Sequence, residues 1–336
     1  MGIQIGPIET RNRVFLAPMS GVTDQPFRQI AHECGAGLVV TEMVASAELV
    51  HQRADMLRRA RGGDRIRPFV VQLAGREAKW MDMGARLAVD LGADIIDINM
   101  GCPARVVTGG LSGSSLMRDP AHALTLIEAT VKAVSVPVTL KMRLGWDDRT
   151  INAPQIARDA ASAGIRLITV HGRTRCQFYK GRADWAAIRQ VRDRISVPLI
   201  ANGDFESLDD VREGLRLSGA DGVMIGRGAY GRPWWPAVIA NGLDAGSGNA
   251  APSLASEAEI VRAHHAAILS FYGNEHGNRI ARKHLRWFID RLVGRKLLTD
   301  GDAHQWRARL LNCADNTMVS ATIAALYGAV SEREAA

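Results

Sequence analysis

Polar and reactive residues stand at the ends of the short apolar runs of this sequence. These runs alternate with longer segments of helical period, and in a barrel of parallel strands the loops after the strands carry the active site. Seven of eight runs end in such residues, which loop composition alone does not explain. The residues are Pro18, Met19, Ser20, Gln72, Asn99, Cys102, Lys141, Arg143, His171, Asn202, Gly203, Asp204, Gly226 and Arg227.

Two of these endings, residues 202–204 and 226–228, indicate a phosphate site. Glycine lets backbone N–H groups approach an anion closely, and the loops after the seventh and eighth strands are the usual phosphate site of such barrels. Two ordinary glycine turns are the alternative. Gly226–Gly231 also has the G-x-G-x-x-G spacing of dinucleotide-binding folds, but it follows the last strand instead of opening a strand–helix–strand unit, so we reject that interpretation.

Three ionisable side chains, Lys141, Arg143 and His171, are expected at the barrel mouth. A charge directly after an apolar strand favours a functional lysine over a solvated one. A lone histidine is more often structural, and only its neighbours favour a role here. The guanidinium of Arg143 presents several donors that suit a carbonyl-bearing heterocycle.

Cys102 is the most informative of these residues. It lies in a turn between Gly101 and Pro103, and a Gly/Ser-rich stretch over 108–115 follows it as a possible lid. A nucleophile would need the thiolate, an acid would need the proton, and a small buried hydrophobe is the usual alternative. The four cysteines form no CxxC pair, so a zinc ribbon is excluded and no metal is predicted.

Eight apolar runs are predicted to be strands, each buried on both faces. They are Val14–Ala17, Leu38–Thr41, Phe69–Leu73, Ile95–Asn99, Val138–Met142, Leu167–Val170, Leu199–Ala201 and Gly222–Ile225. Helical segments such as Ala121–Val134 lie between most of them. The sequence therefore predicts an α/β fold, a (β/α)₈ TIM barrel followed by a small C-terminal all-helical domain, with a doubly wound sheet as the alternative.

The domain boundaries follow from a change of pattern after the eighth run. Residues 1–240 are assigned to the barrel, 241–256 (NGLDAGSGNAAPSLAS) to a linker, and 257–336 to the helical domain. Three helices are expected in the last part, over Glu257–Tyr272, Arg279–Val293 and His304–Tyr327.

The second of these helices carries a basic face. Between Arg279 and Lys296, seven basic residues and one acidic residue give 7 − 1 = +6. Arg282, Lys283 and Arg286 share a helical face with Arg279, which suits a phosphate backbone, although a merely solvated face is the alternative.

The composition limits the classes of protein to which this chain could belong. The 336 residues are 47% hydrophobic and carry a net charge of +7, so a large core is possible and a nucleic-acid partner is permitted. No signal peptide and no apolar stretch of about 18 residues is recognisable, so a soluble cytoplasmic protein with no membrane contact is expected.

Five motifs occur in order along the chain: APMSGVTD (17–24), DINMGCP (97–103), KMRLGW (141–146), VHGRT (170–174) and NGD (202–204). Together they resemble those of the tRNA-dihydrouridine synthases, most closely the bacterial B-type branch. The resemblance spans the barrel and continues into RKHLRW at 282–287. The sequence departs from the family pattern at Ser20, where Ala is frequent, and at Thr108-Gly109-Gly110, where a basic pair is common.

The resemblance implies an FMN-dependent enzyme that uses NADPH to reduce particular uridines in tRNA to 5,6-dihydrouridine. It implies that the flavin ring and ribityl chain are held by Pro18, Met19, Ser20, Gln72, Lys141 and His171. The ribityl end and the phosphate would be held by Asn202, Gly203, Asp204, Gly226 and Arg227. Asn99 and Arg143 would bind the uracil edge, and Arg282, Lys283 and Arg286 would contact tRNA phosphates.

The implied chemistry agrees with these residue types. By this resemblance, hydride would pass from flavin N5 to C6 of the uracil, and Cys102 would give a proton to C5. Lys141 would stabilise the anionic reduced ring, and the base would have to leave the RNA stack.

Two other functions stay open at this point. A flavin barrel acting on a free pyrimidine, like the dihydroorotate dehydrogenases, needs no basic helical appendage. A non-catalytic RNA-binding or regulatory protein that keeps only the barrel fold would not need Cys102, Lys141 or His171.

Overall fold

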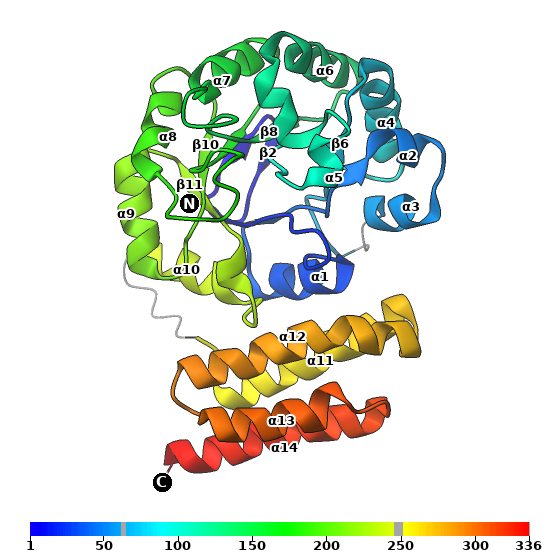
Figure 1. The fold of residues 1–336 in the computed structure, drawn as a ribbon, viewed down its shortest axis with the longest axis vertical. Coiled ribbons are helices and arrows are strands. Elements are labelled where there is room, and N and C mark those ends of the chain that lie inside the picture. The colour runs from blue at the N-terminus through cyan, green and yellow to red at the C-terminus, as the bar shows by residue number, and fades with distance from the viewer. Residues whose placement is uncertain (62–64, 245–250, 336) are drawn as a thin grey trace.

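The computed structural model describes residues 1–61, 65–244 and 251–335. A ring of helices surrounds a closed parallel sheet, and four further helices pack beside the ring, so the predicted barrel and C-terminal helical region are confirmed (Figure 1). The strands are β1 Gln4–Ile5, β2 Ile8–Glu9, β3 Val14–Leu16, β4 Leu38–Val39, β5 Val44–Ala45, β6 Val70–Ala74, β7 Ile95–Met100, β8 Val138–Arg143, β9 Ile168–His171, β10 Leu199–Asn202 and β11 Gly222–Ile225.

The helices of the barrel part alternate with these strands. They are α1 Gln25–Cys34, α2 Ser46–Val50, α3 Ala54–Ala60, α4 Ala78–Asp90, α5 Arg105–Thr108, α6 Pro120–Ala133, α7 Ala153–Ser162, α8 Trp185–Arg192, α9 Leu208–Ser218 and α10 Trp235–Leu243, with 3₁₀ turns η1 Gly113–Arg118 and η2 Arg227–Ala229. The helical region consists of α11 Leu254–Tyr272, α12 Asn274–Gly294, α13 Asp300–Leu311 and α14 Asn316–Ala335.

The barrel closes between β4 and β6. Strands pair in parallel in the order β4-β3-β11-β10-β9-β8-β7-β6, and β5 lies beside β6. Val40, just after β4, bridges to Val70, and the N–H of Thr41 donates to the carbonyl of Val70 at 3.1 Å. The run expected as one strand over Leu38–Thr41 is therefore divided, because the chain changes pairing partner where the ring closes.

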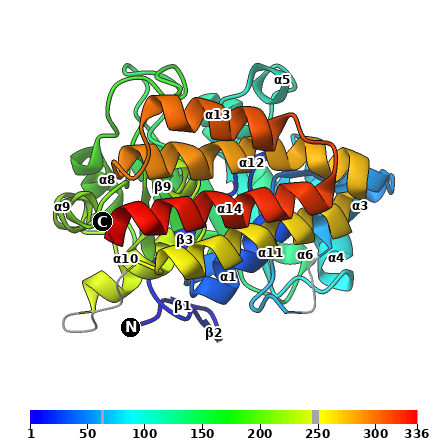
Figure 2. The ribbon, with the colours of Figure 1, turned by 90° about the horizontal axis from the view of Figure 1, so that it is seen from below.

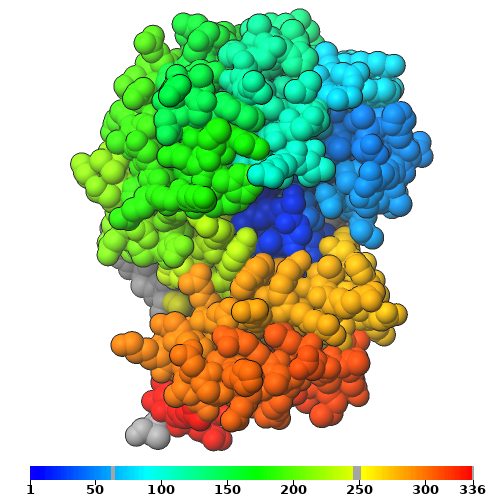
Figure 3. Space-filling view, viewed as in Figure 1, coloured from blue at the N-terminus to red at the C-terminus, as the bar shows by residue number. Residues whose placement is uncertain are grey.

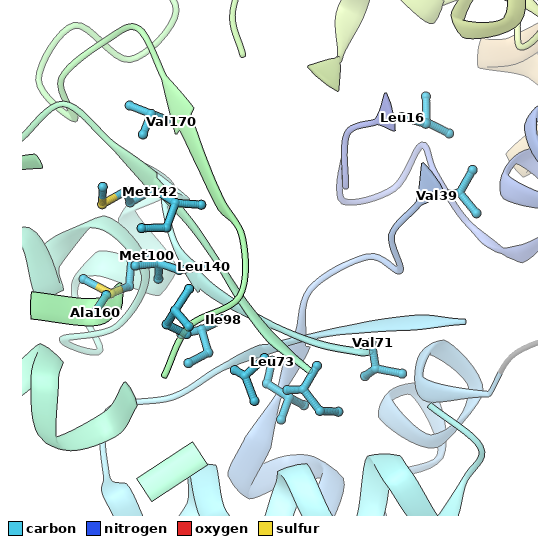
Figure 4. Packing of buried hydrophobic residues seen from close by; sticks show 14 of the residues in the cluster. Leu16, Val39, Val71, Leu73, Ile98, Met100, Leu140, Met142, Ala160 and Val170 are labelled. Atoms are coloured by element: carbon cyan, nitrogen blue, oxygen red, sulfur yellow. The ribbon is translucent and has the colours of Figure 1, made fainter. Parts of the chain in front are cut away.

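Alternation along each strand separates two environments, since successive side chains point to opposite faces. Leu140 and Met142 of β8 belong to the apolar layer between the strands and the outer helices (Figure 4). Thr139, Lys141 and Arg143, on the opposite face, point into the barrel. Several strands extend one residue beyond their predicted ends, and the added residues of β8, β9 and β10 are the polar Arg143, His171 and Asn202.

A hairpin of β1 and β2 closes the amino-terminal end of the barrel (Figure 2). Ile5 is fully buried and packs with Phe15, Ile95 and Ile200 in an apolar cluster inside the barrel. The sequence analysis did not predict this hairpin, whose strands have two residues each. The interior of the barrel is thus apolar at the amino-terminal ends of its strands, and the polar residues of the predicted site lie at the carboxyl ends.

The helical region differs from its prediction in the starts of α11 and α12, which begin three and five residues earlier, and in the last predicted helix. The expected helix over His304–Tyr327 is wrong, since α13 ends at Leu311 and α14 begins at Asn316. The carboxylate of Asp315 accepts a hydrogen bond from the N–H of Thr317 at 2.8 Å, and this cap starts a new helix. Helical period alone does not reveal such a break.

The segment expected as a linker, 241–256, lies partly outside the described residues. Of the described part, residues up to Leu243 belong to α10, and α11 begins at Leu254 with Ser253 as its N-cap. Helical residues therefore occupy both ends of the segment.

The helical region packs on α1 and α10 of the barrel (Figure 1). An aromatic and imidazole cluster lies in the contact with α1. The Phe27 ring lies 5.5 Å from the ring of His264 and 5.6 Å from that of His284, and the two imidazoles are 4.8 Å apart. Burial lowers the pKa of His264 to about 3, so the cluster is neutral at ordinary pH. None of the described helices is long and apolar enough to cross a membrane.

Candidate active site

A cavity of about 510 Å³ opens at the carboxyl ends of the barrel strands. Every residue predicted for the site on the barrel lines it, although they come from seven different strands and their loops. These residues are Pro18, Met19, Ser20, Gln72, Asn99, Cys102, Lys141, Arg143, His171, Asn202, Gly203, Asp204, Gly226 and Arg227. The parallel topology brings them together, as expected from the positions at which their strands end.

A chain of buried hydrogen bonds runs across the floor of the cavity. The hydroxyl of Thr139 donates to Asp97 at 2.6 Å, and the amide of Gln72 donates to the same carboxylate at 2.6 Å. Gln72 in turn accepts from the Asn99 amide at 2.7 Å. Burial raises the pKa of Asp97, while these donors and Lys141 oppose the rise. Asp97 was quoted only as part of a motif, and the structure gives it a part in the floor.

Cys102 is held by its backbone rather than by its thiol. Its N–H donates to the side-chain oxygen of Asn99 at 3.0 Å, and that of Gly101 donates to the same oxygen at 3.1 Å. The hydroxyl of Ser114 donates to the Cys102 carbonyl at 2.8 Å. The thiol is half-buried and lines the cavity. Asn99, assigned by resemblance to the uracil edge, therefore also fixes the turn that carries the cysteine.

Lys141 is the cation at the centre of the floor. Its ammonium donates to the side-chain oxygen of Asn202 at 3.1 Å. Burial, together with the charge of Arg143, lowers the pKa of Lys141 to about 8, and Asp97 opposes this shift. The lysine is thus charged at neutral pH but close to titration.

His171 is neutral and has a defined tautomer. Burial, reinforced by Arg143, Lys141 and two further arginines, holds its pKa well below the ordinary value. Its Nε2 lies 3.3 Å from a guanidinium nitrogen of Arg173, which can only donate, so Nε2 accepts and Nδ1 carries the proton. A side chain at Gly203 would begin 2.9 Å from the imidazole, so glycine is required against this ring.

Asp204 organises the loop after β10. Its carboxylate pairs with Arg173 at 2.5 and 2.9 Å, with Arg227 at 3.1 Å, and with the N–H of Ala183 at 2.8 Å. Burial alone would raise the pKa of Asp204, but these partners hold it below its usual range. Resemblance assigned Asp204 to the ribityl end and phosphate. In the structure its carboxylate pairs with Arg227, whose side chain stays 45% exposed at the cavity wall.

Most of the hydrogen bonds of the Arg143 guanidinium go to backbone carbonyls. It donates to the carbonyls of Gly101 at 2.8 Å, Thr174 at 2.9 Å and Phe178 at 2.9 Å, and is 1% exposed. Burial lowers its pKa to about 10, so it remains charged at neutral pH. The arginine therefore ties the loops after β7 and β9 together at the edge of the cavity.

The sequence analysis missed several residues at the cavity. Arg173 was quoted inside a motif without a role, and Tyr179, Met43 and Tyr230 were not singled out, yet the last three line the wall. The Tyr179 ring lies between Arg227, at 5.1 Å, and Arg143, at 5.6 Å. Its position in a long loop after β9 gave no periodic signal.

The three basic residues predicted on the helical region lie outside the cavity and do not share one environment. Arg282 and Arg286 are exposed on α12, and Arg286 lies 3.9 Å from Asp290. Lys283 instead turns toward the barrel, and its ammonium donates to the carbonyl of Gly21. The common face expected from the spacing is thus divided between solvent and barrel.

A closed parallel barrel whose interior is apolar at the amino-terminal end and which has a polar cavity at the carboxyl end defines an enzyme of the TIM-barrel class. Histamine dehydrogenase from Rhizobium sp. 4-9 has a similar fold, with a TM-score of 0.56 and 16% identity over 79% of this chain and 50% of that chain. A 2-naphthoyl-CoA reductase gives a TM-score of 0.54 at 12% identity, over 72% of this chain and 52% of that one. These two likenesses concern the fold.

Comparison with related sequences identifies the family within this class of enzymes. Residues 15–325 match the family model described as dihydrouridine synthase (Dus). A probable tRNA-dihydrouridine synthase of Rhizobium leguminosarum bv. phaseoli is 56% identical, covering 98% of this chain and all of the relative. The tRNA-dihydrouridine synthase B of Pseudomonas putida is 43% identical over 97% of this chain and 94% of its own. The chain belongs to the dihydrouridine synthase family, which confirms the resemblance seen in the motifs.

Proposed function

We propose that this enzyme reduces particular uridines in tRNA to 5,6-dihydrouridine, with FMN as bound cofactor and NADPH as reductant. One observation carries the proposal. A single cavity gathers a thiol, a buried ammonium, a neutral imidazole and two glycine-containing loops, which are the groups that a flavin and a pyrimidine would need together.

The cavity fits FMN by the chemistry of its donors. Lys141 and Arg227 are cationic groups for the anionic parts of the cofactor, and the neutral His171 adds an N–H donor. A side chain at Gly226 would project to within 3.7 Å of Met19 Sδ, into the space between the first and last loops, which glycine leaves free. Asp204 adds little repulsion there because it is paired with two arginines.

FMN, when bound, supplies the hydride that reduces C6 of the uracil. Cys102 then provides the proton at C5, a general-acid step that fits its half-buried thiol at the cavity wall. Asn99 keeps that thiol in place by accepting the N–H groups of Gly101 and Cys102. Arg143, buried and charged at this edge, faces the pyrimidine carbonyls with its remaining donor capacity.

Access by an RNA base requires it to leave the stack, which costs a few kcal/mol. The mouth offers apolar and aromatic groups for a flipped base, since Val106 is 87% and Tyr179 47% exposed there. Exposed Arg282 and Arg286 on α12 supply phosphate contacts that a free pyrimidine would not use.

Two measurements test the proposal together. The purified protein is expected to show a flavin spectrum that NADPH bleaches. Mapping of dihydrouridine in tRNA from a deletion strain should show the loss of this base at defined positions, restored by the wild-type gene. A yellow protein whose deletion leaves tRNA dihydrouridine intact, but which reduces a free pyrimidine, would replace this proposal by the free-pyrimidine alternative.

A further inference from the structure

Helix α12 presents a stripe of three residues to the barrel, distinct from its exposed arginines. Lys283, Trp287 and Arg291 are spaced by four residues each and so lie along one face of the helix. We call them the docking stripe. Leu285 and Phe288 face the helical core instead.

One end of the stripe holds the first loop of the cavity. Lys283 donates to the carbonyl of Gly21, a residue whose φ of +74° lies in the left-handed region that favours glycine. The N–H of Gly21 donates to the buried Glu42 at 2.6 Å. The loop is tight, because the N–H of Met19 donates to Thr23 at 2.8 Å and the carbonyl of Met19 accepts from the N–H of Thr23 at 3.0 Å. Movement of Gly21 therefore moves the cavity residue Met19.

The other end holds the last loop of the cavity. The Trp287 ring stacks on Tyr230 with centroids 4.1 Å apart and an interplanar angle of 13°. Arg291 donates to the Tyr230 carbonyl at 2.9 Å. A side chain at Gly231 would begin 2.3 Å from the carbonyl of Trp287, so helix and loop touch at the backbone. Tyr230 itself lines the cavity beyond Gly226–Gly228.

The space-filling view agrees with this arrangement. In Figure 3 the dark blue atoms of the N-terminal segment are visible between the green barrel loops and the yellow-to-orange atoms of α12. The helix thus contacts both neighbouring loops, the one after β3 and the one after β11. Gly226 of the second loop faces Met19 of the first.

We propose that the docking stripe of α12 positions the first and last loops of the cofactor cavity, and that Lys283 is a positioning residue of the flavin site rather than a contact to RNA phosphate. The inference rests on the proposed FMN site. It makes the helical region a part of cofactor binding even when no RNA is present.

The test compares Lys283→Met with Lys283→Arg, which keeps a donor, and with Arg282→Gln, which removes the neighbouring exposed charge. Flavin-stripped, full-length proteins are titrated with FMN in the absence of RNA. Lys283→Met should raise the Kd for FMN by about tenfold, by analogy with the loss of metal affinity when a residue that supports a metal ligand is replaced. Lys283→Arg should recover most of this affinity, and Arg282→Gln should match the wild type.

Steady-state kinetics separate positioning from RNA contact. With FMN saturating, Lys283→Met should lower kcat while the KM for an unmodified tRNA transcript stays within about twofold. Trp287→Leu, which leaves Lys283 in place, should weaken FMN binding in the same direction, and it serves where the lysine variant does not fold by circular dichroism. Unchanged FMN affinity in both variants overturns the inference, and so does a Lys283→Met variant that loses only tRNA affinity. Failure of the wild-type protein to bind FMN would instead refute the proposed function.

Discussion

Cys102 shows how a reactive side chain can be placed by groups that do not touch it. Asn99 binds its N–H and Ser114 its carbonyl, so the thiol position is set by backbone hydrogen bonds. Replacing the thiol should therefore leave the cavity intact. We expect Cys102→Ala to retain FMN and its reduction by NADPH, while turnover on tRNA falls by about 10²–10⁴, the contribution of a positioned acid. Stopped-flow bleaching and dihydrouridine formation measure the two halves.

The matched control for that change is Cys176→Ala. Cys176 is an exposed free cysteine in the loop after β9, and its removal should leave both rates at the wild-type level. If NADPH no longer reduces the flavin in Cys102→Ala, the thiol has another role than protonating C5.

Lys141 gives a second prediction, because its pKa of about 8 lies below the ordinary value of 10.5. The free cavity thus loses this positive charge as pH rises through about 8, whereas anionic FMN favours the protonated form. Affinity for FMN should then weaken above pH 8, by at most about tenfold per pH unit. Fluorescence titration of the flavin-stripped protein between pH 6.5 and 9.5 measures this.

The same titration of Lys141→Met supplies the control. This variant should bind FMN more weakly at pH 7 and show no inflection near pH 8. His171 does not contribute to the curve, because it is already neutral, and Arg143 titrates at about 10. A wild-type affinity that stays level to pH 9.5 would contradict the assigned role of Lys141.

At the scale of elements, α12 has one face in the helical core, one against the barrel and one in solvent, and the sequence alone does not separate the last two. Spacing correctly places Leu285 and Phe288 in the core, but it gives no information about which neighbour covers the other sides. Lys283 was therefore grouped with Arg282 and Arg286, although it binds the barrel. A helical pattern defines angles around one axis, whereas the orientation toward another domain depends on tertiary contacts.

The division of α12 changes the expected RNA energetics. Of the three residues predicted to contact phosphates, two, Arg282 and Arg286, are exposed. Each full phosphate contact adds about 0.7–0.9 to the slope of log K against log[salt]. Arg282→Gln with Arg286→Gln should weaken tRNA binding and flatten that slope by about two units at most. The measurement is a tRNA titration at several salt concentrations.

A double change of the same net charge far from α12 provides the comparison. Lys132→Gln on α6 with Arg158→Gln on α7 removes two exposed cations from the outside of the barrel. This variant should keep the wild-type slope. Equal slopes in both double variants would mean that the α12 arginines are merely solvated.

The sequence predicted the barrel and the cavity more completely than the elements around them. Strand ends could be identified because an apolar run gives way to a polar residue, and parallel strands bring such ends together, as Gln72, Lys141 and Asn202 show. The short hairpin at the barrel floor and β5 escaped prediction because two-residue strands carry no period. Tyr179 escaped because its loop is positioned by long-range contacts.

For the whole molecule, the joint between barrel and helical region is sensitive to acid. His264 packs against both Phe27 and His284, and its Nε2 has no hydrogen-bond partner in the described structure. Burial lowers its pKa from 6.5 to about 3, and the nearby His265 and Lys283 reinforce the shift. The unfolded chain therefore binds a proton between pH 6.5 and 3 that the folded protein does not, and stability falls as pH decreases through this window.

The size of this effect follows from the two pKa values. Between pH 7 and 5, His264 alone should reduce the free energy of unfolding by about 2 kcal/mol. His264→Phe keeps a ring against Phe27 and His284 but cannot be protonated, so it should remove about that much of the pH dependence. Equilibrium urea unfolding at pH 5, 6 and 7 measures it, with the exposed His304→Gln on α13 as the control. Because this joint also carries α12, loss of FMN should accompany the acid transition in the wild type and shift to lower pH in His264→Phe; identical pH profiles for the two proteins would contradict a buried neutral imidazole at the joint.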